Sequence, residues 1–341
     1  MQLERLIGRF PIGYWLSGNR LLASVIALSV IVAGCGSQRT APAVVPSPPA
    51  ATAPQEIRVR VAGKIVGVPL EDYVTATALS EMTPVGESAD TIARVYEVQT
   101  IVARTYALAH LGRHRAEGFD LCDTTHCQIY EPARLASSRF AGEARRATTR
   151  TAGRVLTYGT SPIDALFHAD CGGHTTSPEQ VWGSVSFPYL RPEPDDVPAV
   201  KHRSWSLTLT RFDLLQALDA DRRTAVGDRL KSVVLSDADT SGRVTRVTVT
   251  GSDGRVTLRS DDFRNAVNKR LGARAIMSTR FHMSRSPNGA DYVLSGTGFG
   301  HGIGLCQVGA LARARRGAEA AEILAAYFPG TRLSRPGAKL P

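Results

Sequence analysis

Glu81 is the residue for which the sequence indicates the most specific chemistry. It lies in the stretch Leu79-Ser80-Glu81-Met82-Thr83-Pro84, at the end of a helical pattern that begins at Leu70. The residues eleven, seven, four and three positions before it are Leu70, Val74, Thr77 and Ala78. Residues at this spacing share one face of a helix, so Glu81 is expected to point inward. Pro84 disfavours helix at the residue before it, so the helix is expected to end near Glu81.

This position determines the expected acidity of Glu81. A carboxylate at a helix C-terminus meets the negative end of the helix dipole, and apolar surroundings disfavour its charged form, so both effects raise its pKa. A carboxyl group that is partly protonated near neutral pH can act as a general acid. The alternative is a solvated glutamate at a frayed helix end, without a chemical role. The stretch alone does not separate the two.

Three loops rich in glycine and polar residues carry further side chains with chemical potential, over residues 122–130, 168–175 and 298–310. Each loop has a structural explanation of its own, such as a buried strand histidine or a turn before a helix. Their joint occurrence indicates a site. The residues concerned are Cys122, His126, Cys127, Gln128, Tyr130, His168, Asp170, Cys171, Gly172, Gly173, His301, Cys306 and Gln307.

The elements expected around these loops predict an α+β fold. A hairpin of strands 57–61 and 65–68 leads into the Glu81 helix, and a second helix follows at 91–112. Short strands are expected at 154–158 and 163–168. A smaller, strand-rich unit then combines a three-stranded meander with two helices, and the last helix covers 318–328. The meander strands are 232–235, 244–250 and 255–258, and the two helices are 211–218 and 261–271.

Composition divides the chain into five segments. We expect a lipoprotein signal peptide at 1–34, a Pro/Ala-rich tether at 35–56, the first part of the core at 57–195, an inserted α/β subdomain at 196–290 and the C-terminal part of the core at 291–335. The tether holds five prolines among small residues and has nothing to pack against.

The N-terminus predicts export and anchoring. Basic residues precede an apolar run at 21–32, which is shorter than the ~20 residues of a typical membrane span. Val32-Ala33-Gly34-Cys35 resembles a bacterial lipobox, so Cys35 is expected to be lipidated on the outer face of a bacterial membrane. The alternative is a single anchoring helix with an incidental Cys35. The net charge of +10 comes without any nucleic-acid-binding motif, so no nucleic-acid partner is expected.

Four cysteines remain beyond Cys35. An even number in an exported protein predicts two disulfides among Cys122, Cys127, Cys171 and Cys306, with three pairings open.

The order of several motifs resembles the SpoIID/LytB family. The resemblance extends from about residue 57 to 334 and is loose over 200–290. It rests on Ser80-Glu81-Met82, Val102-Ala103-Arg104-Thr105-Tyr106-Ala107, Gln128-Ile129-Tyr130, Phe167 to Thr175, Val181-Trp182-Gly183 and the GHGxGxxQxGA pattern from Gly300 to Ala310.

The resemblance implies action on peptidoglycan, with the family's catalytic glutamate at Glu81. Sporulation members of the family are lytic transglycosylases, which cleave peptide-stripped glycan strands between N-acetylmuramic acid and N-acetylglucosamine. Such an enzyme needs one carboxyl group. The residues expected to hold the sugar are Gln128, Tyr130, His168, His301 and Gln307, together with the backbone amides of Gly172 and Gly173. The alternative is a non-catalytic glycan-binding lipoprotein that enhances a partner cell-wall amidase, as LytB members were named.

The cysteines depart from the family pattern, in which serine is common at the positions of Cys171 and Cys306. Some members bind zinc in the loop that corresponds to residues 122–127. Cys122, His126 and Cys127 then supply three ligands, with His114 or Cys171 as the fourth. The rival arrangement has Cys122–Cys127 and Cys171–Cys306 disulfides. No other cofactor is expected, and a zinc hydrolase built on this loop is a third competing function.

Overall fold

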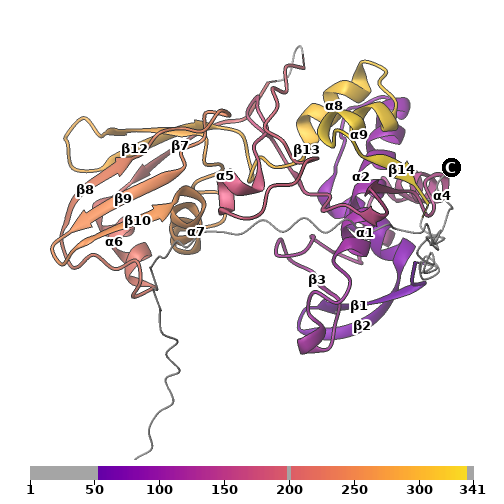
Figure 1. The fold of residues 1–341 in the computed structure, drawn as a ribbon, viewed down its shortest axis with the longest axis horizontal. Helices are drawn as coiled ribbons and strands as arrows, with labels where there is room; N and C mark the ends of the chain where they lie inside the picture. The colour runs from indigo at the N-terminus through magenta and orange to yellow at the C-terminus, as the bar shows by residue number, and fades with distance from the viewer. Residues whose placement is uncertain (1–52, 198–200, 336–341) are drawn as a thin grey trace, which may run out of the picture. The chain divides into compact units, whose positions relative to one another are not determined.

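The computed structural model describes residues 53–197 and 201–335, which form an α+β fold with two separate hydrophobic cores (Figure 1). The expected signal peptide, most of the tether and Cys35 lie outside the described residues. Within the described ranges, no helix combines the length and the apolar character that crossing a membrane requires.

The N-terminal hairpin is confirmed. Strand β1 (Glu56–Val61) pairs antiparallel with β2 (Lys64–Pro69), and β3 (Leu121–Cys122) adds in parallel on the other side of β1. The two turn residues, Ala62 and Gly63, both have positive φ, as the tight turn of a two-residue hairpin requires. The hairpin feeds directly into the Glu81 helix.

Helix α1 (Leu70–Glu81) ends at the predicted residue. It packs against α2 (Ala89–Ala109) and α4 (Ala141–Arg150). Eight of its twelve residues are therefore buried, rather than the single face that the spacing predicted. Helix α2 begins after Ser88, whose hydroxyl accepts a hydrogen bond from the Thr91 amide, so it starts slightly before the expected helix and also ends before it.

A short parallel ladder joins distant parts of the chain in the first core. Strand β6 (Phe167–His168) pairs with β13 (Leu305–Cys306), and β13 runs directly into α8 (Gln307–Arg315). The strand expected at 163–168 is therefore wrong over its first four residues. There the Leu166 amide bonds the Asp164 carbonyl in a tight turn, which is incompatible with an extended strand.

The other elements of the first core are short. They are α3 (Arg134–Ser137), β4 (Val155–Tyr158), β5 (Ser161–Pro162), α5 (Pro178–Trp182), α9 (Ala320–Tyr327) and β14 (Arg332–Ser334), together with the 3₁₀ turn η1 (Arg115–Glu117). Strand β4 lies between β14 and β5 in one sheet, so the last strand of the described chain pairs with its middle part.

The second core contains two three-stranded antiparallel sheets and two helices. One sheet is the predicted meander, in the order β10-β9-β8, and the other has the order β11-β12-β7. The elements are β7 (Ser204–Leu209), α6 (Arg211–Asp219), β8 (Leu230–Leu235), β9 (Arg246–Gly251), β10 (Arg255–Arg259), α7 (Ser260–Leu271), β11 (Phe281–Arg285) and β12 (Tyr292–Thr297). The meander and both helices were predicted from the sequence, whereas β7, β11 and β12 were not.

Polar contacts connect the two cores through the segment that follows β6. Trp182 donates its indole N–H to Asp261 over 3.2 Å, and Arg243 donates to the Cys171 carbonyl over 2.8 Å. Asp170 accepts from the Arg203 amide over 2.6 Å and lies 2.7 Å from His202 Nδ1. The second core is therefore attached to the loops that carry the predicted site residues.

Candidate functional site

Glu81 is the last residue of α1, and its carboxyl group lies partly buried under the segment that follows β3. The backbone N–H of Ile129 donates to Glu81 Oε1 over 3.0 Å. The described residues offer no hydrogen bond to Oε2. One carboxylate oxygen is therefore fixed and the other is available.

Burial raises the pKa of the Glu81 carboxyl from 4.5 to about 7, the hydrogen bond from Ile129 lowers it, and the nearby Glu131 carboxylate raises it. Burial was one of the two causes expected from the sequence. A group with this pKa is populated in both protonation states near neutral pH, as a residue that must act first as an acid and then as a base requires.

Gln307 is the predicted substrate-binding residue that the structure brings to Glu81. Its side-chain amide lies 3.4 Å from the Glu81 carbonyl oxygen and 3.4 Å from Oε1 of the buried Gln99. Gln307 begins α8, so the β6–β13 ladder sets its position. The sequence offered no signal for Gln99, which is an ordinary polar residue within a helical pattern.

Gln128 and Tyr130 flank Ile129, and both are buried. The Gln128 side-chain amide donates to the Ala103 carbonyl over 3.2 Å, and the Tyr130 ring stacks on Tyr73 with centroids 5.0 Å apart. In this arrangement the two side chains point into the core and fix the segment whose amide binds Glu81. They act on the carboxyl group through Ile129, a residue that sequence reasoning did not single out.

His168 and His301 form a second cluster, on the β6–β13 side of the core. Their rings lie 5.4 Å apart, and Trp182 lies 5.4 Å from His301. Burial lowers the pKa of His301 to about 4 and that of His168 well below its ordinary value, so both imidazoles are neutral at neutral pH.

The amides of Gly172 and Gly173 are already used within the protein. Gly172 donates to Asp170 Oδ1 over 2.8 Å, and Gly173 donates to Cys171 Sγ over 3.2 Å. Asp170, the nearest candidate for a second catalytic carboxylate, is buried and accepts bonds from the Gly172 and Arg203 amides beside His202. The structure therefore gives Asp170 a role in holding loops together and leaves Glu81 as the available carboxyl group.

Four metal-ligand side chains converge near β3. His114, Cys122, His126 and Cys127 each place a ligand atom within 4.8 Å of the others. His126 Nδ1 lies 3.7 Å from both sulfurs, and His114 Nε2 lies 3.5 Å from Cys127 Sγ. Zinc with Zn–S of about 2.3 Å and Zn–N of about 2.0 Å places neighbouring S and N ligands about 3.5 Å apart in a tetrahedron.

The hydrogen-bond partner of His114 fits zinc as well. His114 Nδ1 lies 2.6 Å from the Glu117 carboxylate, which leaves Nε2 to face Cys127. His114 is therefore the fourth member of this set, and Cys171 belongs to another cluster. The four cysteines within the described residues are free thiols, so the two predicted disulfides are not formed in this structure.

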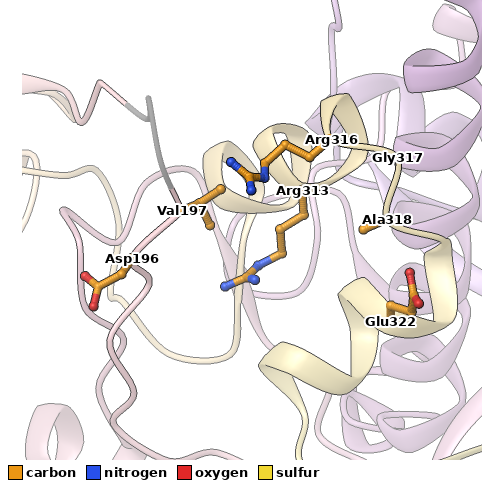
Figure 2. A pocket seen from close by; sticks show the side chains of 7 residues that line it. All are labelled: Asp196, Val197, Arg313, Arg316, Gly317, Ala318 and Glu322. Atoms are coloured by element: carbon orange, nitrogen blue, oxygen red, sulfur yellow. The ribbon is translucent and has the colours of Figure 1, made fainter.

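A cavity of about 410 Å³ opens beside α8 and α9 (Figure 2). Its lining contains none of the predicted site residues. It is lined by Asp196, Val197, Arg313, Arg316, Gly317, Ala318 and Glu322. The buried Asp195 accepts bonds from Arg313, one of these lining residues, over 2.9 Å and from the Tyr327 hydroxyl over 2.9 Å. No sequence pattern indicated a role for Asp195, which stands at the expected boundary between the first part of the core and the inserted subdomain.

Comparisons with known proteins agree with this architecture. Residues 60–158 match the SpoIID family, described as a stage II sporulation protein, and residues 202–304 match a domain of unknown function, DUF8618. The chain is 29% identical to an uncharacterised protein of Brachyspira hyodysenteriae over 262 residues, which cover 76% of this chain and 65% of that protein.

Two Bacillus subtilis proteins are also similar. Stage II sporulation protein D is 27% identical over 290 residues, which cover 81% of this chain and 77% of that protein. The amidase enhancer is 27% identical over 281 residues, which cover 70% of this chain and 37% of that protein. The SpoIID match includes Glu81 and the loop that holds it, so this part of the chain is similar to the SpoIID family, and most of the chain is similar to the two Bacillus subtilis proteins.

Proposed function

We propose that this protein acts in the bacterial cell wall as a lytic transglycosylase, with Glu81 as its single acid and base. The observation that carries the proposal is the Glu81 carboxyl group, whose pKa is raised to about 7 by burial while one backbone amide fixes Oε1. The substrate class comes from the family resemblance and from relatives named for sporulation and for amidase enhancement.

The reaction requires two proton transfers. Protonated Glu81 gives its proton to the glycosidic oxygen as the bond from the anomeric carbon of N-acetylmuramic acid breaks. The resulting carboxylate takes the proton of the muramic acid 6-hydroxyl, whose oxygen bonds the same carbon and closes a 1,6-anhydro ring. Oε2 is the oxygen placed for both transfers, since Ile129 occupies Oε1. Acid–base transfer of this kind contributes roughly 10²- to 10⁴-fold in rate.

The side chains around Glu81 hold it in place. Gln307 fixes the backbone at the end of α1, and Gln128 and Tyr130 fix the Ile129 segment. The resemblance implies that Gln128, Tyr130, His168, His301 and Gln307 contact sugar. Of these, Gln307 lies beside Glu81, and the proposal assigns it the contact with the strand.

Zinc at His114, Cys122, His126 and Cys127 has a structural role in this proposal. Four protein donors complete a tetrahedron, so no coordination position remains for a catalytic water. Such an ion fastens the loop that ends in the Ile129 segment to η1 and β3. This donor set supports a stabilised loop and argues against a zinc hydrolase.

A second function is a glycan-binding protein that enhances a cell-wall amidase without cleaving strands. The observation in its favour is the relative named amidase enhancer, which is similar over 70% of this chain. It needs the fold and the basic charge but not the acidity of Glu81. Product chemistry separates the two functions, because only the enzyme creates anhydro ends.

The test is digestion of purified glycan strands, with and without stem peptides, by the full chain. Mass spectrometry measures anhydro-muramic ends. We expect cleavage of peptide-free strands by the wild type and none by Glu81→Gln. Glu131→Gln is the matched control, because it neutralises the neighbouring carboxylate and should retain cleavage with its pH profile moved to lower pH. Full cleavage by a folded Glu81→Gln protein would refute the proposal, and intact strands with every variant would favour the amidase-enhancing function.

A further inference from the structure

A second set of metal-ligand side chains lies on the β6–β13 ladder. His168, Cys171 and Cys306 place their ligand atoms within 4.8 Å of one another, and all three residues are buried. We propose that these residues bind a zinc ion, separate from the one at His114, Cys122, His126 and Cys127. Thiolate and imidazole donors in a tetrahedral arrangement are the set that zinc favours.

The orientation of His168 supports a bound metal ion. Its Nδ1 lies 3.1 Å from the Ile303 carbonyl oxygen, which can only accept, so the ring proton sits on Nδ1 and the lone pair on Nε2. Nε2 is buried and has no hydrogen-bond partner among the described residues. A buried polar atom without a partner is costly, whereas a carbonyl-oriented imidazole with a free Nε2 is the usual form of a metal-binding histidine.

The surroundings of the Cys171 and Cys306 sulfurs also support a bound metal ion. The backbone amides of Cys171 and Gly309 lie 3.2 and 3.4 Å from Cys306 Sγ, and the Gly173 amide lies 3.2 Å from Cys171 Sγ. Both sulfurs therefore have backbone N–H groups directed at them, as the sulfurs of metal-bound cysteines commonly do. Cys306 also directly precedes α8, so its position is set by the start of that helix.

A buried positive charge and a candidate fourth donor atom lie close to the proposed zinc ligands. The guanidinium of Arg243 is buried and donates to the Cys171 carbonyl over 2.8 Å, which places a positive charge next to the loop that carries Cys171. Asp195 Oδ2 lies 3.4 Å from Cys171 Sγ, close to the roughly 3.5 Å between neighbouring O and S ligands in a tetrahedral zinc site. We assign Asp195 as the fourth ligand, drawn in from its present position beside Tyr327.

The ion would act on the candidate active site through the chain. It joins the loop after β6 to β13, and the residue after Cys306 is Gln307, whose side chain contacts the end of α1. A Cys171–Cys306 disulfide would make the same connection. The disulfide would, however, leave the buried His168 Nε2 without a partner. A metal ion would bind that atom, so the geometry favours an ion over a disulfide.

The test is the zinc content of the purified full chain, measured by mass spectrometry of the metal without chelators in the buffers. We expect two zinc ions per wild-type chain. Cys122→Ser/Cys127→Ser should retain one, and so should Cys171→Ser/Cys306→Ser. Serine is close to cysteine in size and still accepts the backbone bonds, and the one ion retained by each variant reports that it folds. His168→Asn should also retain a single ion, because Asn cannot reach the position of Nε2.

Two results would overturn the proposal. One is a single zinc ion in the wild type that is lost entirely from Cys122→Ser/Cys127→Ser. The other is a Cys171–Cys306 cross-link found in non-reduced peptides of protein that was never exposed to oxidant. If Cys171→Ser/Cys306→Ser does not fold, the zinc content of His168→Asn tests the site instead. Two zinc ions per chain in that variant would also refute the site.

Discussion

Replacing Glu81 by Gln should stabilise the protein at neutral pH while abolishing strand cleavage. The carboxyl group is protonated in the folded state up to pH values at which the unfolded chain has already released its proton. Its pKa rises from 4.5 in the unfolded chain to about 7 in the fold. At about 1.4 kcal/mol per pKa unit, this difference costs the fold about 3 kcal/mol once the pH exceeds 7.

The sign of the pH dependence follows from the raised pKa. Below about pH 4.5 the group is protonated in both states and costs nothing. Between pH 4.5 and 7 the unfolded state loses its proton first, so the free energy of unfolding falls as pH rises. Gln at this position does not titrate and can still accept the Ile129 bond. The difference in free energy of unfolding between variant and wild type should therefore rise by about 3 kcal/mol across this window.

Urea unfolding of the wild type and of Glu81→Gln at a series of pH values measures that difference. All other titrating groups are the same in both proteins, so their contributions to the free energy of unfolding cancel in the difference. The same proteins assayed on peptide-free strands should show wild-type kcat/KM falling above about pH 7, since the first step needs the protonated acid. A difference in free energy that does not change between pH 4.5 and 8 would refute the raised pKa, whatever the activity of the variant.

Three further predictions test other parts of the proposal. Cys35→Ser should release the protein from membrane fractions or leave its precursor uncleaved, and wild-type fractionation and migration would refute lipidation. Gly309→Ala should destabilise the fold by several kcal/mol in urea unfolding, because the added methyl would meet the Tyr327 hydroxyl and the Asp195 carboxylate. The matched control Gly142→Ala, also in a helix, meets only the end of Arg146 at 3.5 Å and should be neutral or stabilising by up to about 1 kcal/mol. Gln307→Leu should lower the free energy of unfolding by about 1–3 kcal/mol, because Gln99 loses its buried partner; an unchanged unfolding midpoint would contradict this role.

Local patterns predicted the Glu81 end of the site well. Helix α1 and the hairpin before it depend on nearby residues, namely the apolar spacing, a tight turn and Pro84, so the sequence contains what is needed to place them. The extent of burial around α1 was not predictable, because it comes from helices that are distant in the sequence and pack against it.

The rest of the candidate site depends on contacts between distant residues. Nothing near Ile129 indicates that its amide holds Glu81, and nothing near Asp195 indicates that it gathers Arg313 and Tyr327. The glycines at 172 and 173 looked like open hydrogen-bond donors, yet their amides are taken by Asp170 and Cys171. Sequence identifies residue types, whereas the partner of each polar group is decided by packing.

The contact between Gln307 and the Glu81 backbone joins residues 226 positions apart. The second core, by contrast, is built from one continuous stretch between β7 and β12. A chain that emerges N-terminus first can therefore assemble the second core before the β6–β13 ladder exists, because local contacts form before distant ones. Gln307 can contact Glu81 only after β13 and α8 have been synthesised. The order of synthesis thus delays completion of the candidate active site until nearly the whole chain is available.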